Sequence, residues 1–346
     1  MVNRLDSMDV LRGCAALFVL LYHMEELGVA SWPNLFHWGW VGVDLFFVLS
    51  GFFITICVLK PKEWKQFDFI KRRFMRIAPP YYISMIFVVA MSGFYFASTG
   101  NGLFHVLVHL LFLHTYIDGA HGSINGVYWS LGVEFSFYIF MLFSAKCIRR
   151  GVNTFILIVL MIATSWVWRA GCYFLLPEDP MQRFIWSTQL FGMLDEFAIG
   201  AVVAIIYFKY IVHGSMVPWP VVYFILSIGI GLITLFIYNI DADYWSSIDT
   251  MVFSRTYLSI GFSLVILSFI FLEHKVWFRA LCRYSGLSFL GSISYSIYLF
   301  HLPIINAGLN SGVSRNHLFT ISILCCVLLV SVISYRFFEK PFMRSR

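Results

Sequence analysis

The sequence predicts an all-α polytopic membrane protein, and three observations support this fold class. Hydrophobic residues make up 60% of the 346 residues and charged residues only 12%, about half of the roughly 25% that soluble domains carry. Apolar runs long enough to cross a bilayer recur along the whole chain. Lys and Arg gather at the ends of alternate runs. The alternating segments of about ten residues that mark an outer-membrane barrel do not occur in the sequence.

About ten transmembrane helices are expected, all within a single membrane domain over residues 1–346. We place them at 10–27, 39–59, 79–98, 127–145, 153–175, 188–209, 217–238, 252–272, 286–306 and 317–338. Basic residues follow the second, fourth, sixth, eighth and tenth spans, and such loops mark the cytoplasmic side. Both termini are therefore expected in the cytoplasm, with the protein in the cytoplasmic (inner) membrane. Arg169, Arg183 and Arg315 are the exceptions on the opposite side.

One further apolar segment, 103–117, is expected to form a short interfacial or re-entrant helix on the outer face. It is short for a span and carries His105, His109 and His114. Counting it as a span would also move Arg149 and Arg150 to the outside. His105 and His109 are spaced i,i+4, but no third ligand accompanies them, so no metal site is expected.

Cysteine spacing and overall charge exclude other classes of protein. The seven cysteines show no zinc spacing and no disulfide framework, so we interpret them as small buried hydrophobic residues. The first apolar run lacks a cleavage pattern and should remain as the first span. The net charge is +6 at pH 7. Because the basic residues lie at span ends, the lipid bilayer and not nucleic acid is the expected partner.

Two ionisable residues in the first span, Arg12 and His23, are the main candidates for function. Eleven steps of about 100° return to the same helix face, and a rise of about 1.5 Å per residue separates them by roughly 16 Å. Such groups usually line an interior or a wet cavity. His23 is expected to act as a general base or to carry an acyl group. Arg12 is expected to hold phosphate or carboxylate; a snorkelling arginine and a packed histidine are the alternatives.

The second and third spans add an acid and an arginine pair. Asp44 lies about one turn inside the second span, where we expect it to pair with His23 and raise its basicity. Glycines 39, 42 and 51 predict close helix approach. Arg73 and Arg76 are spaced i,i+3 at the start of the third span. They are expected to bind the phosphates of a nucleotide-like donor, and a positive-inside anchor is the alternative.

Three later spans carry further candidate residues. In the fourth span Ser130 and Glu134 share a face, and Tyr128 and Trp129 precede them. In the sixth span, Glu196 is favoured over Asp195 as the residue that faces the cavity. Polar spacing in the ninth span predicts a face that lines the same cavity, with an aromatic packing stripe as the alternative; this face consists of Ser294, Tyr298 and His301. Glu339, after the tenth span, is expected to pair with nearby bases, as most surface ions do.

Taken together, these segments resemble the membrane acyltransferase-3 family over nearly the whole chain. Five motifs carry the resemblance in the family's order. They are Arg12-Gly with His23 after ten intervening residues, Gly42-Val-Asp44-Leu-Phe-Phe-Val-Leu-Ser50-Gly51-Phe52, Arg73-x-x-Arg76-Ile-x-Pro79, Trp129-Ser130-Leu-x-Val-Glu134-Phe-x-Phe-Tyr138 and Ser294-Tyr295-Ser-Ile-Tyr-Leu-Phe-His301.

The resemblance implies an activity and a set of residue roles. Family members move an acyl group, usually acetyl from acetyl-coenzyme A, across the cytoplasmic membrane to a hydroxyl of a glycan such as lipopolysaccharide O-antigen, peptidoglycan, capsule or exopolysaccharide. Arg12 and His23 match the family's essential pair, and Arg73 and Arg76 match its second arginine motif. Many relatives carry an esterase-like domain after the last span. None is expected here, which makes a separate extracytoplasmic transferase a candidate partner.

The sequence thus predicts an integral-membrane O-acetyltransferase that uses acetyl-coenzyme A as cosubstrate, needs no metal and modifies a glycan or lipid-linked glycan. Catalysis is assigned to His23 with Asp44 and Glu134, and donor binding to Arg12, Arg73 and Arg76. Acceptor binding is assigned to a larger set, namely Trp129, Tyr128, Ser130, Glu196, Tyr298 and His301. Within this set, Trp129 and Tyr128 are expected to stack on a sugar face at the outer rim. A permease for amphipathic or anionic molecules and a non-catalytic scaffold for glycan assembly are the alternatives.

Overall fold

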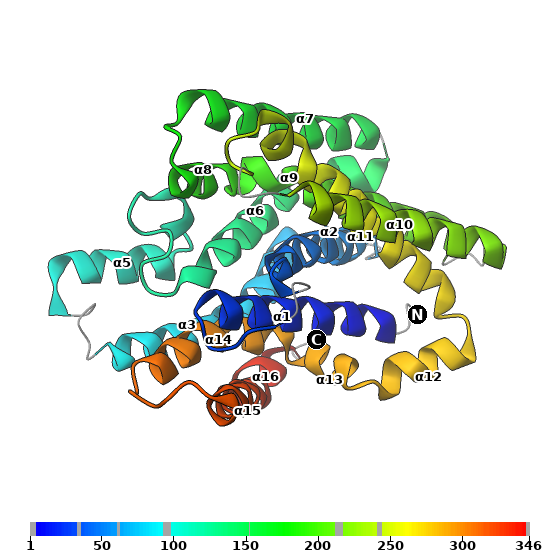
Figure 1. Ribbon diagram of the computed structural model, residues 1–346. Coiled ribbons are helices and arrows are strands. Elements are labelled where there is room, and N and C mark those ends of the chain that lie inside the picture. The colour runs from blue at the N-terminus through cyan, green and yellow to red at the C-terminus, as the bar shows by residue number, and fades with distance from the viewer. Residues whose placement is uncertain are drawn as a thin grey trace. The chain divides into compact units, whose positions relative to one another are not determined.

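The computed structural model describes residues 5–32, 36–60, 63–92, 98–151, 153–211, 217–240 and 244–343. Throughout these ranges the chain forms helices and no strand (Figure 1). Nine of the helices in these ranges are long and apolar enough to cross a membrane, and a bent helix pair makes a tenth candidate. The predicted all-α membrane fold is therefore confirmed.

The helix bounds follow the predicted spans closely. The long helices are α1 (Asp6–Glu26), α2 (Gly42–Leu59), α3 (Gln66–Met91), α6 (Trp129–Arg150), α7 (Thr154–Leu175), α9 (Leu190–Ile206), α10 (Trp219–Asn239), α11 (Ile248–Leu272) and α15 (His317–Ser334). The shorter ones are α5 (Gly100–Leu110), α8 (Pro180–Ser187), α12 (Val276–Tyr284), α13 (Gly286–Ser292), α14 (Ser294–Leu309) and α16 (Lys340–Met343). Three 3₁₀ segments, η2 (Gly39–Val41), η3 (His114–Tyr116) and η4 (Gly126–Tyr128), and two π-helical segments, η5 (Tyr207–Ile211) and η6 (Tyr335–Glu339), complete the order.

The third helix differs most from its prediction. It begins at Gln66 and not near Pro79, so Arg73 and Arg76 lie inside it. Proline favours the first turn of a helix, which is why the sequence suggested a start there. In the structure Pro79 and Pro80 lie within α3, as proline sometimes does in membrane helices. The far end of this predicted span, residues 93–97, lies outside the described residues.

Segment 103–117 forms a short helix, as predicted. Its helix, α5, is followed by the 3₁₀ turn η3, and α5 is not among the candidate spans found in the described ranges. The Thr99 hydroxyl accepts a hydrogen bond of 3.0 Å from the backbone N–H of Gly102 and caps the helix N-terminus.

The ninth predicted span is a broken helix. Its two parts, α13 and α14, meet at an angle of 80° around Ile293. Broken helices inside a membrane are tolerated where protein covers the freed backbone groups. Ser294, the first residue of α14, is fully buried, in agreement with such cover.

The chain packs as two compact units. Unit 1 holds residues 1–11, 44–65 and 136–288, and unit 2 holds residues 12–43, 66–135 and 289–346. In unit 1, α9 and α11 pack against α7, and α10 lies along α11 (Figure 1). In the same unit, Gly51 of α2 lies against the backbone of Phe197 in α9, where a Cβ would collide. The close approach predicted for Gly51 is confirmed.

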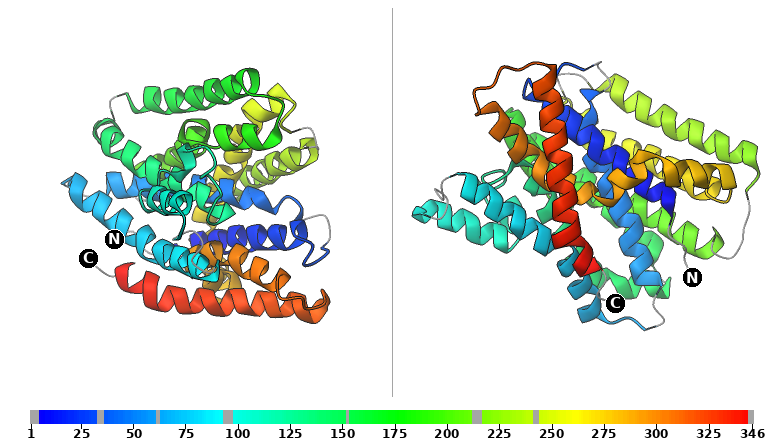
Figure 2. Two further views of the ribbon diagram at one scale, coloured as in Figure 1. Left: turned by 90° about the vertical axis from the view of Figure 1, so that its left-hand side faces the viewer. Right: turned by 90° about the horizontal axis from the view of Figure 1, so that it is seen from below.

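Unit 2 is built on α1, α3, α14 and α15. Helices α14 and α15 lie side by side (Figure 2), and η6 at the end of α15 packs against α3. Gly39 and Gly42 lie directly against the backbone of α1 at Phe18 and Ala15. These two contacts confirm the predicted glycine-mediated approach and fix the part of α1 that carries His23.

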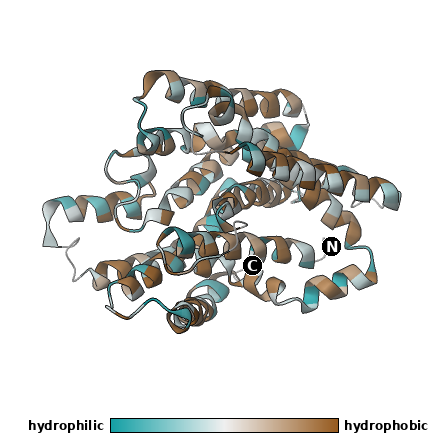
Figure 3. Cartoon of the chain, in the orientation of Figure 1, coloured by the Kyte–Doolittle hydropathy of each residue, from teal (hydrophilic) through white to brown (hydrophobic). Residues whose placement is uncertain are grey.

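Apolar residues make up much of the helices, as Figure 3 shows by residue hydropathy. Only 22% of the membrane window of α7 and 17% of that of α10 are buried. Phe155 of α7 is 77% exposed and Tyr238 of α10 is 82% exposed. Such surfaces suit contact with lipid and not with water.

Candidate active site

The centre of the candidate site is a pair of histidines in unit 2. His23 of α1 and His301 of α14 have ring centroids 5.0 Å apart, and His301 Nε2 lies 3.3 Å from His23 Nδ1. His301 is fully buried, whereas His23 is partly exposed. The structure thus brings together two residues that the sequence singled out 278 positions apart.

The hydrogen bonds assign a tautomer to both rings. His23 Nδ1 lies 2.9 Å from the carbonyl of Val19, and His301 Nδ1 lies 3.0 Å from the carbonyl of Ile297. Carbonyl oxygens only accept, so in the neutral rings both Nδ1 atoms carry the proton. His301 Nε2 then accepts from His23 Nδ1–H, which it shares with Val19. This leaves the lone pair of His23 on Nε2, the atom that a base or nucleophile uses.

The carboxylate that acts on His23 within unit 2 is Glu26, which sequence reasoning missed. Glu26 lies three residues after His23 on α1 and interacts with the imidazole electrostatically. It also accepts a hydrogen bond from the Tyr22 hydroxyl. The i,i+3 spacing was the available signal, but Glu26 lies at the polar end of the span, where an acid is unremarkable.

A hydroxyl network adjoins the histidine pair. Tyr298 lies one turn before His301 on α14, and its hydroxyl donates to the Val127 carbonyl over 2.8 Å. The same oxygen lies 2.6 Å from Ser130 Oγ. Glu134, one turn after Ser130 on α6, interacts electrostatically with Tyr298. The structure therefore gathers three of the predicted site residues, Ser130 and Glu134 of α6 and Tyr298 of α14, around one network.

The other end of α1 carries a cluster of opposite charges. Glu339, the last residue of η6, is only 2% exposed and interacts electrostatically with Arg12 of α1 and Arg76 of α3. Its Oε2 accepts a 3.1 Å hydrogen bond from the Ser296 hydroxyl of α14. The expected surface ion is thus a buried one. Arg73, one turn before Arg76 on α3, is half-buried, as Arg12 and Arg76 are.

Two predicted sugar-stacking residues lie in the packed interior. Tyr128 is fully buried, and its hydroxyl lies 2.7 Å from Ser84 Oγ. Trp129 is 9% exposed and stacks on His121 with ring centroids 6.0 Å apart. We expected these rings at an exposed rim. Both rings are instead buried: Tyr128 is the last residue of η4 and Trp129 follows it. Asn125 caps η4, and its amide donates to the Leu299 carbonyl of α14 over 3.1 Å.

Asp44 has a different partner from the one predicted. In unit 1 its Oδ1 lies 2.5 Å from Arg255 Nη1 of α11, and Glu196 Oε1 lies 3.8 Å from the same nitrogen. All three side chains are buried. The expected pairing of Asp44 with His23 is therefore replaced by an ion pair with Arg255. A residue 211 positions away gives no local sequence signal for such a pair.

Two of the exceptional arginines are also internal partners. Arg169 of α7 is 1% exposed and forms an ion pair with Asp195 of α9, whose Oδ2 also accepts from Thr256 over 2.5 Å. Arg183 is 4% exposed and donates to the Tyr173 carbonyl over 3.2 Å. Their departure from the positive-inside pattern follows from burial, because they are not loop charges.

Two histidines of segment 103–117 stack on each other. His109 and His114 have ring centroids 4.1 Å apart and an interplanar angle of 7°. Burial lowers the pKa of His109 to about 3, with a further contribution from His114, and lowers the pKa of His114 to about 4. Among the described residues, no group of three His, Cys, Asp or Glu side chains is arranged to hold a metal.

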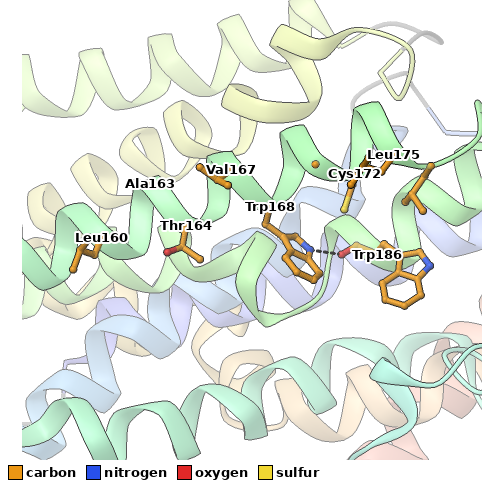
Figure 4. A pocket seen from close by; sticks show the side chains of 10 residues that line it. Leu160, Ala163, Thr164, Val167, Trp168, Cys172, Leu175 and Trp186 are labelled. Carbon is orange, nitrogen blue, oxygen red and sulfur yellow. Dashed lines mark hydrogen bonds between the residues drawn. The ribbon is translucent and has the colours of Figure 1, made fainter.

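Each of the two units contains a cavity. In unit 1, an apolar cavity of 490 Å³ runs between α7 and α8, where Trp168 Nε1 donates to the Trp186 carbonyl over 2.7 Å (Figure 4). In unit 2, a cavity of 310 Å³ has a mixed lining that includes Asn125, Asn306 and Asn310. Asn306 lies on a different face of α14 from His301, five residues of about 100° further on.

Comparison with known proteins identifies the family. The model of a family described as an acyltransferase domain matches residues 5–336. The chain belongs to this acyltransferase family. The match covers every residue of the histidine pair and the hydroxyl network, and it covers Arg12, Arg73 and Arg76. It ends three residues before Glu339.

Curated relatives of this chain include peptidoglycan O-acetyltransferase OatA of Listeria monocytogenes, 25% identical over 98% of the chain and 56% of the relative. The putative peptidoglycan O-acetyltransferase YrhL of Bacillus subtilis is 25% identical over 97% of the chain and 54% of the relative. O-acetyltransferase OatA of Staphylococcus aureus is 25% identical over 97% of the chain and 57% of the relative. The chain thus spans little more than half the length of these relatives. No solved structure matches it.

Proposed function

We propose that this acyltransferase moves an acetyl group from acetyl-coenzyme A, on the cytoplasmic side of the inner membrane, to a hydroxyl of an extracytoplasmic glycan. One observation carries the proposal: a single continuous helix, α1, bears the His23 imidazole at one end and an arginine cluster toward the other. Helix geometry separates the two by roughly 16 Å. A transfer across a membrane needs such a separation between the end that binds the donor and the end that meets the acceptor.

The arginine end suits the donor. Arg12 and Arg76 with Glu339 leave one net positive charge, and Arg73 adds another on the same face of α3. Guanidinium groups bind phosphate oxygens in bidentate pairs. The phosphates of coenzyme A are the anions that we assign to this end, which places it on the cytoplasmic side.

The histidine end suits the acyl transfer itself. In the tautomer set by Val19 and His301, His23 Nε2 accepts the proton of the acceptor hydroxyl. At the same time the hydroxyl oxygen attacks the acyl carbon. The C–S bond then breaks, and the thiolate takes up a proton. Alternatively, Nε2 attacks first and holds the acetyl group until the hydroxyl displaces it. Glu134, Ser130 and Tyr298 are the groups that we place near the acceptor.

The acceptor class rests on the relatives. Two of them are named as peptidoglycan O-acetyltransferases, one of these as putative, so peptidoglycan is the first glycan to test, with lipopolysaccharide O-antigen, capsule and exopolysaccharide after it. The asparagine side chains of the 310 Å³ cavity in unit 2 provide amides of the kind that bind sugar hydroxyls.

The decisive experiment measures the O-acetyl content of surface glycans by proton NMR and by acetate released in mild base. Cells that express the wild type should show O-acetyl signals, and cells without the gene or with His23→Ala should not. His317→Ala, at an exposed position of α15, is the matched control and should behave as wild type. Unchanged O-acetylation with His23→Ala at equal protein level would contradict the proposal.

Purified protein separates this proposal from the permease alternative. With acetyl-coenzyme A and a hydroxyl acceptor, a transferase releases free thiol in proportion to the ester formed, whereas a permease releases none. A labelled acetyl group trapped on the protein without acceptor would support the carrier version of the mechanism over the base version.

A further inference from the structure

The charged group around Arg255 in unit 1 holds more acid than base. Arg169 forms an ion pair with Asp195, and Arg255 forms one with Asp44. Glu196 is the third acid, and its Oε1 lies 3.8 Å from the same Arg255 nitrogen that binds Asp44. The group therefore has one negative charge in excess if all three acids are ionised.

The surroundings make that excess charge costly. All three acids are fully buried, and the helices that carry them, α2 and α9, are candidate membrane spans. Arg183, a further buried arginine of this unit, donates to backbone carbonyls and does not balance the group. A buried charge is unfavourable unless it is paired and hydrogen-bonded, and carboxylates inside a membrane mark ion or proton sites. A bound proton would remove the excess.

The contacts indicate which acid holds the proton. Asp44 Oδ1 accepts a hydrogen bond of 2.5 Å from Arg255 Nη1, as an ionised carboxylate does. Glu196 Oε1, at 3.8 Å from this nitrogen, lies beyond hydrogen-bond range. Among the described residues, no other donor reaches Asp44 Oδ2 or either oxygen of Glu196. The two carboxyl groups still act as hydrogen-bond partners. Because carboxylates only accept, one of the two has to carry a proton, and the distances favour Glu196.

The other charges that act on Glu196 agree with a neutral side chain. Asp44 and Asp195 repel a negative charge at this position, and Arg255 attracts it. Arg255 already has Asp44 as its ionised partner, and its Nε donates to the Tyr244 hydroxyl over 3.2 Å. Glu196 therefore lies next to a guanidinium group that another acid has neutralised.

Two serine hydroxyls of α11 offer this proton a route. Ser259 and Ser263 follow Arg255 at i+4 and i+8, so they continue the same side of the helix, roughly 6 and 12 Å further along it. Both side chains are buried. In the part of the chain that the structure describes, neither hydroxyl has a hydrogen-bond partner. A hydroxyl donates and accepts, so the two serines are suited to pass a proton or to hold water that does.

We propose that Glu196 and Asp44 form a proton-exchange site within unit 1, which Ser259 and Ser263 connect to the C-terminal end of α11. In the resting protein Glu196 carries the proton and Asp44 is ionised. In exchange, the O–H bond of Glu196 breaks as another proton reaches the pair from the hydroxyls, so the total charge does not change. The inference goes beyond the proposed acetyl transfer, which uses neither carboxyl group.

Infrared spectroscopy of the full chain in detergent tests the bound proton. A protonated carboxyl group absorbs apart from ionised carboxylates, and its band shifts in D₂O. At pH 7, Glu196→Gln should lose the band of one protonated carboxyl group per chain. Asp44→Asn should lose the same band, because Glu196 then ionises to pair with Arg255. Glu178→Gln, at an exposed position before α8, is the matched control and should lose only carboxylate absorption.

Several outcomes would overturn the bound proton. One is a protonated carboxyl band that is unchanged in folded Glu196→Gln. Where that variant does not fold, persistence of the band in Asp44→Asn has the same force, and so does the lack of any such band in the wild type. A band that disappears when sodium replaces potassium would identify a metal cation, and not a proton, as the ligand. None of these measurements uses an acetyl donor, so they leave the proposed function untouched.

Transfer of the protein into D₂O tests the route. In the double variant Ser259→Ala with Ser263→Ala the carboxyl band should remain, but its shift in D₂O should be several-fold slower than in the wild type. Ser268→Ala is the control on the same helix, because this buried hydroxyl already donates to the Leu264 carbonyl over 2.8 Å. It should leave the exchange rate unchanged. Equal rates in the double variant and the wild type would contradict the route along α11.

Discussion

The two ring nitrogens of His23 have different surroundings. Nδ1 is held by the Val19 carbonyl and by His301, so the ring has a fixed orientation and a fixed tautomer. Nε2 then keeps the lone pair. In serine hydrolases an acid performs this orienting task for the catalytic histidine, and we expected Asp44 to perform it here. The structure gives His301 that place.

This arrangement predicts how substitutions of His301 differ. His301→Leu removes the acceptor for His23 Nδ1–H and should lower the rate of acetyl transfer by about 10²-fold, the low end for a positioned proton-transfer group. His301→Gln retains an acceptor oxygen and should keep more of the rate. The measurement is ester formed per minute at equal protein. Equal rates for His301→Leu and wild type would remove His301 from the mechanism.

The stacked pair His109 and His114 predicts a pH dependence of stability. Burial lowers both pKa values, to about 3 and about 4, below the ordinary value of about 6.5. The unfolded chain therefore binds protons at these positions before the folded chain does. The contribution of this neutral histidine pair to the stability of the fold is therefore fully present above about pH 6.5, and it is lost as the pH falls toward 4.

Thermal unfolding in detergent checks this sign. The Tm should fall between pH 7 and pH 5, and His114→Gln should flatten the fall. His317→Gln, at an exposed position, should leave the slope unchanged. A Tm that rises as the pH falls through this window would show that the pair binds protons in the folded state.

At the scale of elements, the helices were predictable and their neighbours were not. Hydropathy located the spans because burial in lipid requires long apolar runs. Periodicity placed Arg12 and His23 on one face of α1, and Ser130 and Glu134 on one face of α6. A face does not specify the helix that it meets. Three features show this. Asp44 pairs with Arg255, and His23 contacts His301, each across more than 200 positions. Glu339 is buried among residues of other helices.

The ion pair between α7 and α9 predicts a large effect on stability. Arg169→Met leaves Asp195 buried without its guanidinium partner and should cost about 3–5 kcal/mol of unfolding free energy. The double variant Arg169→Met with Asp195→Leu should recover most of that loss, since an apolar pair of similar volume is often neutral. Unfolding in mixed micelles gives both values.

A second ion pair of unit 1 provides the contrast. Arg283 lies 3.1 Å from Asp6, but its side chain is 61% exposed. Exposed pairs contribute about 0–1 kcal/mol, so Arg283→Ala should change the unfolding free energy little. If Arg169→Met and Arg283→Ala cost the same, burial would not be what gives the α7–α9 pair its importance.

At the scale of the whole molecule, the direction of the proposed acetyl transfer depends on which side of the membrane each loop faces. The arginine end of α1 must face the cytoplasm and the histidine end must face outward if acetyl-coenzyme A is the donor. The positive-inside pattern agrees with this orientation. It becomes more regular once Arg169 and Arg183 are recognised as buried internal partners.

Cysteine accessibility tests this orientation together with the broken span. In a variant without its seven native cysteines, His274→Cys, between α11 and α12, should react only with a membrane-permeant thiol reagent. Ser311→Cys, between α14 and α15, should react with an impermeant one, as should Glu178→Cys between α7 and α8. All three positions are exposed. Labelling of His274→Cys and Ser311→Cys from the same side would mean that α13 and α14 do not cross the membrane. The helix that carries His301 would then be re-entrant. A helix other than α14 would have to line the proposed transfer path opposite α1.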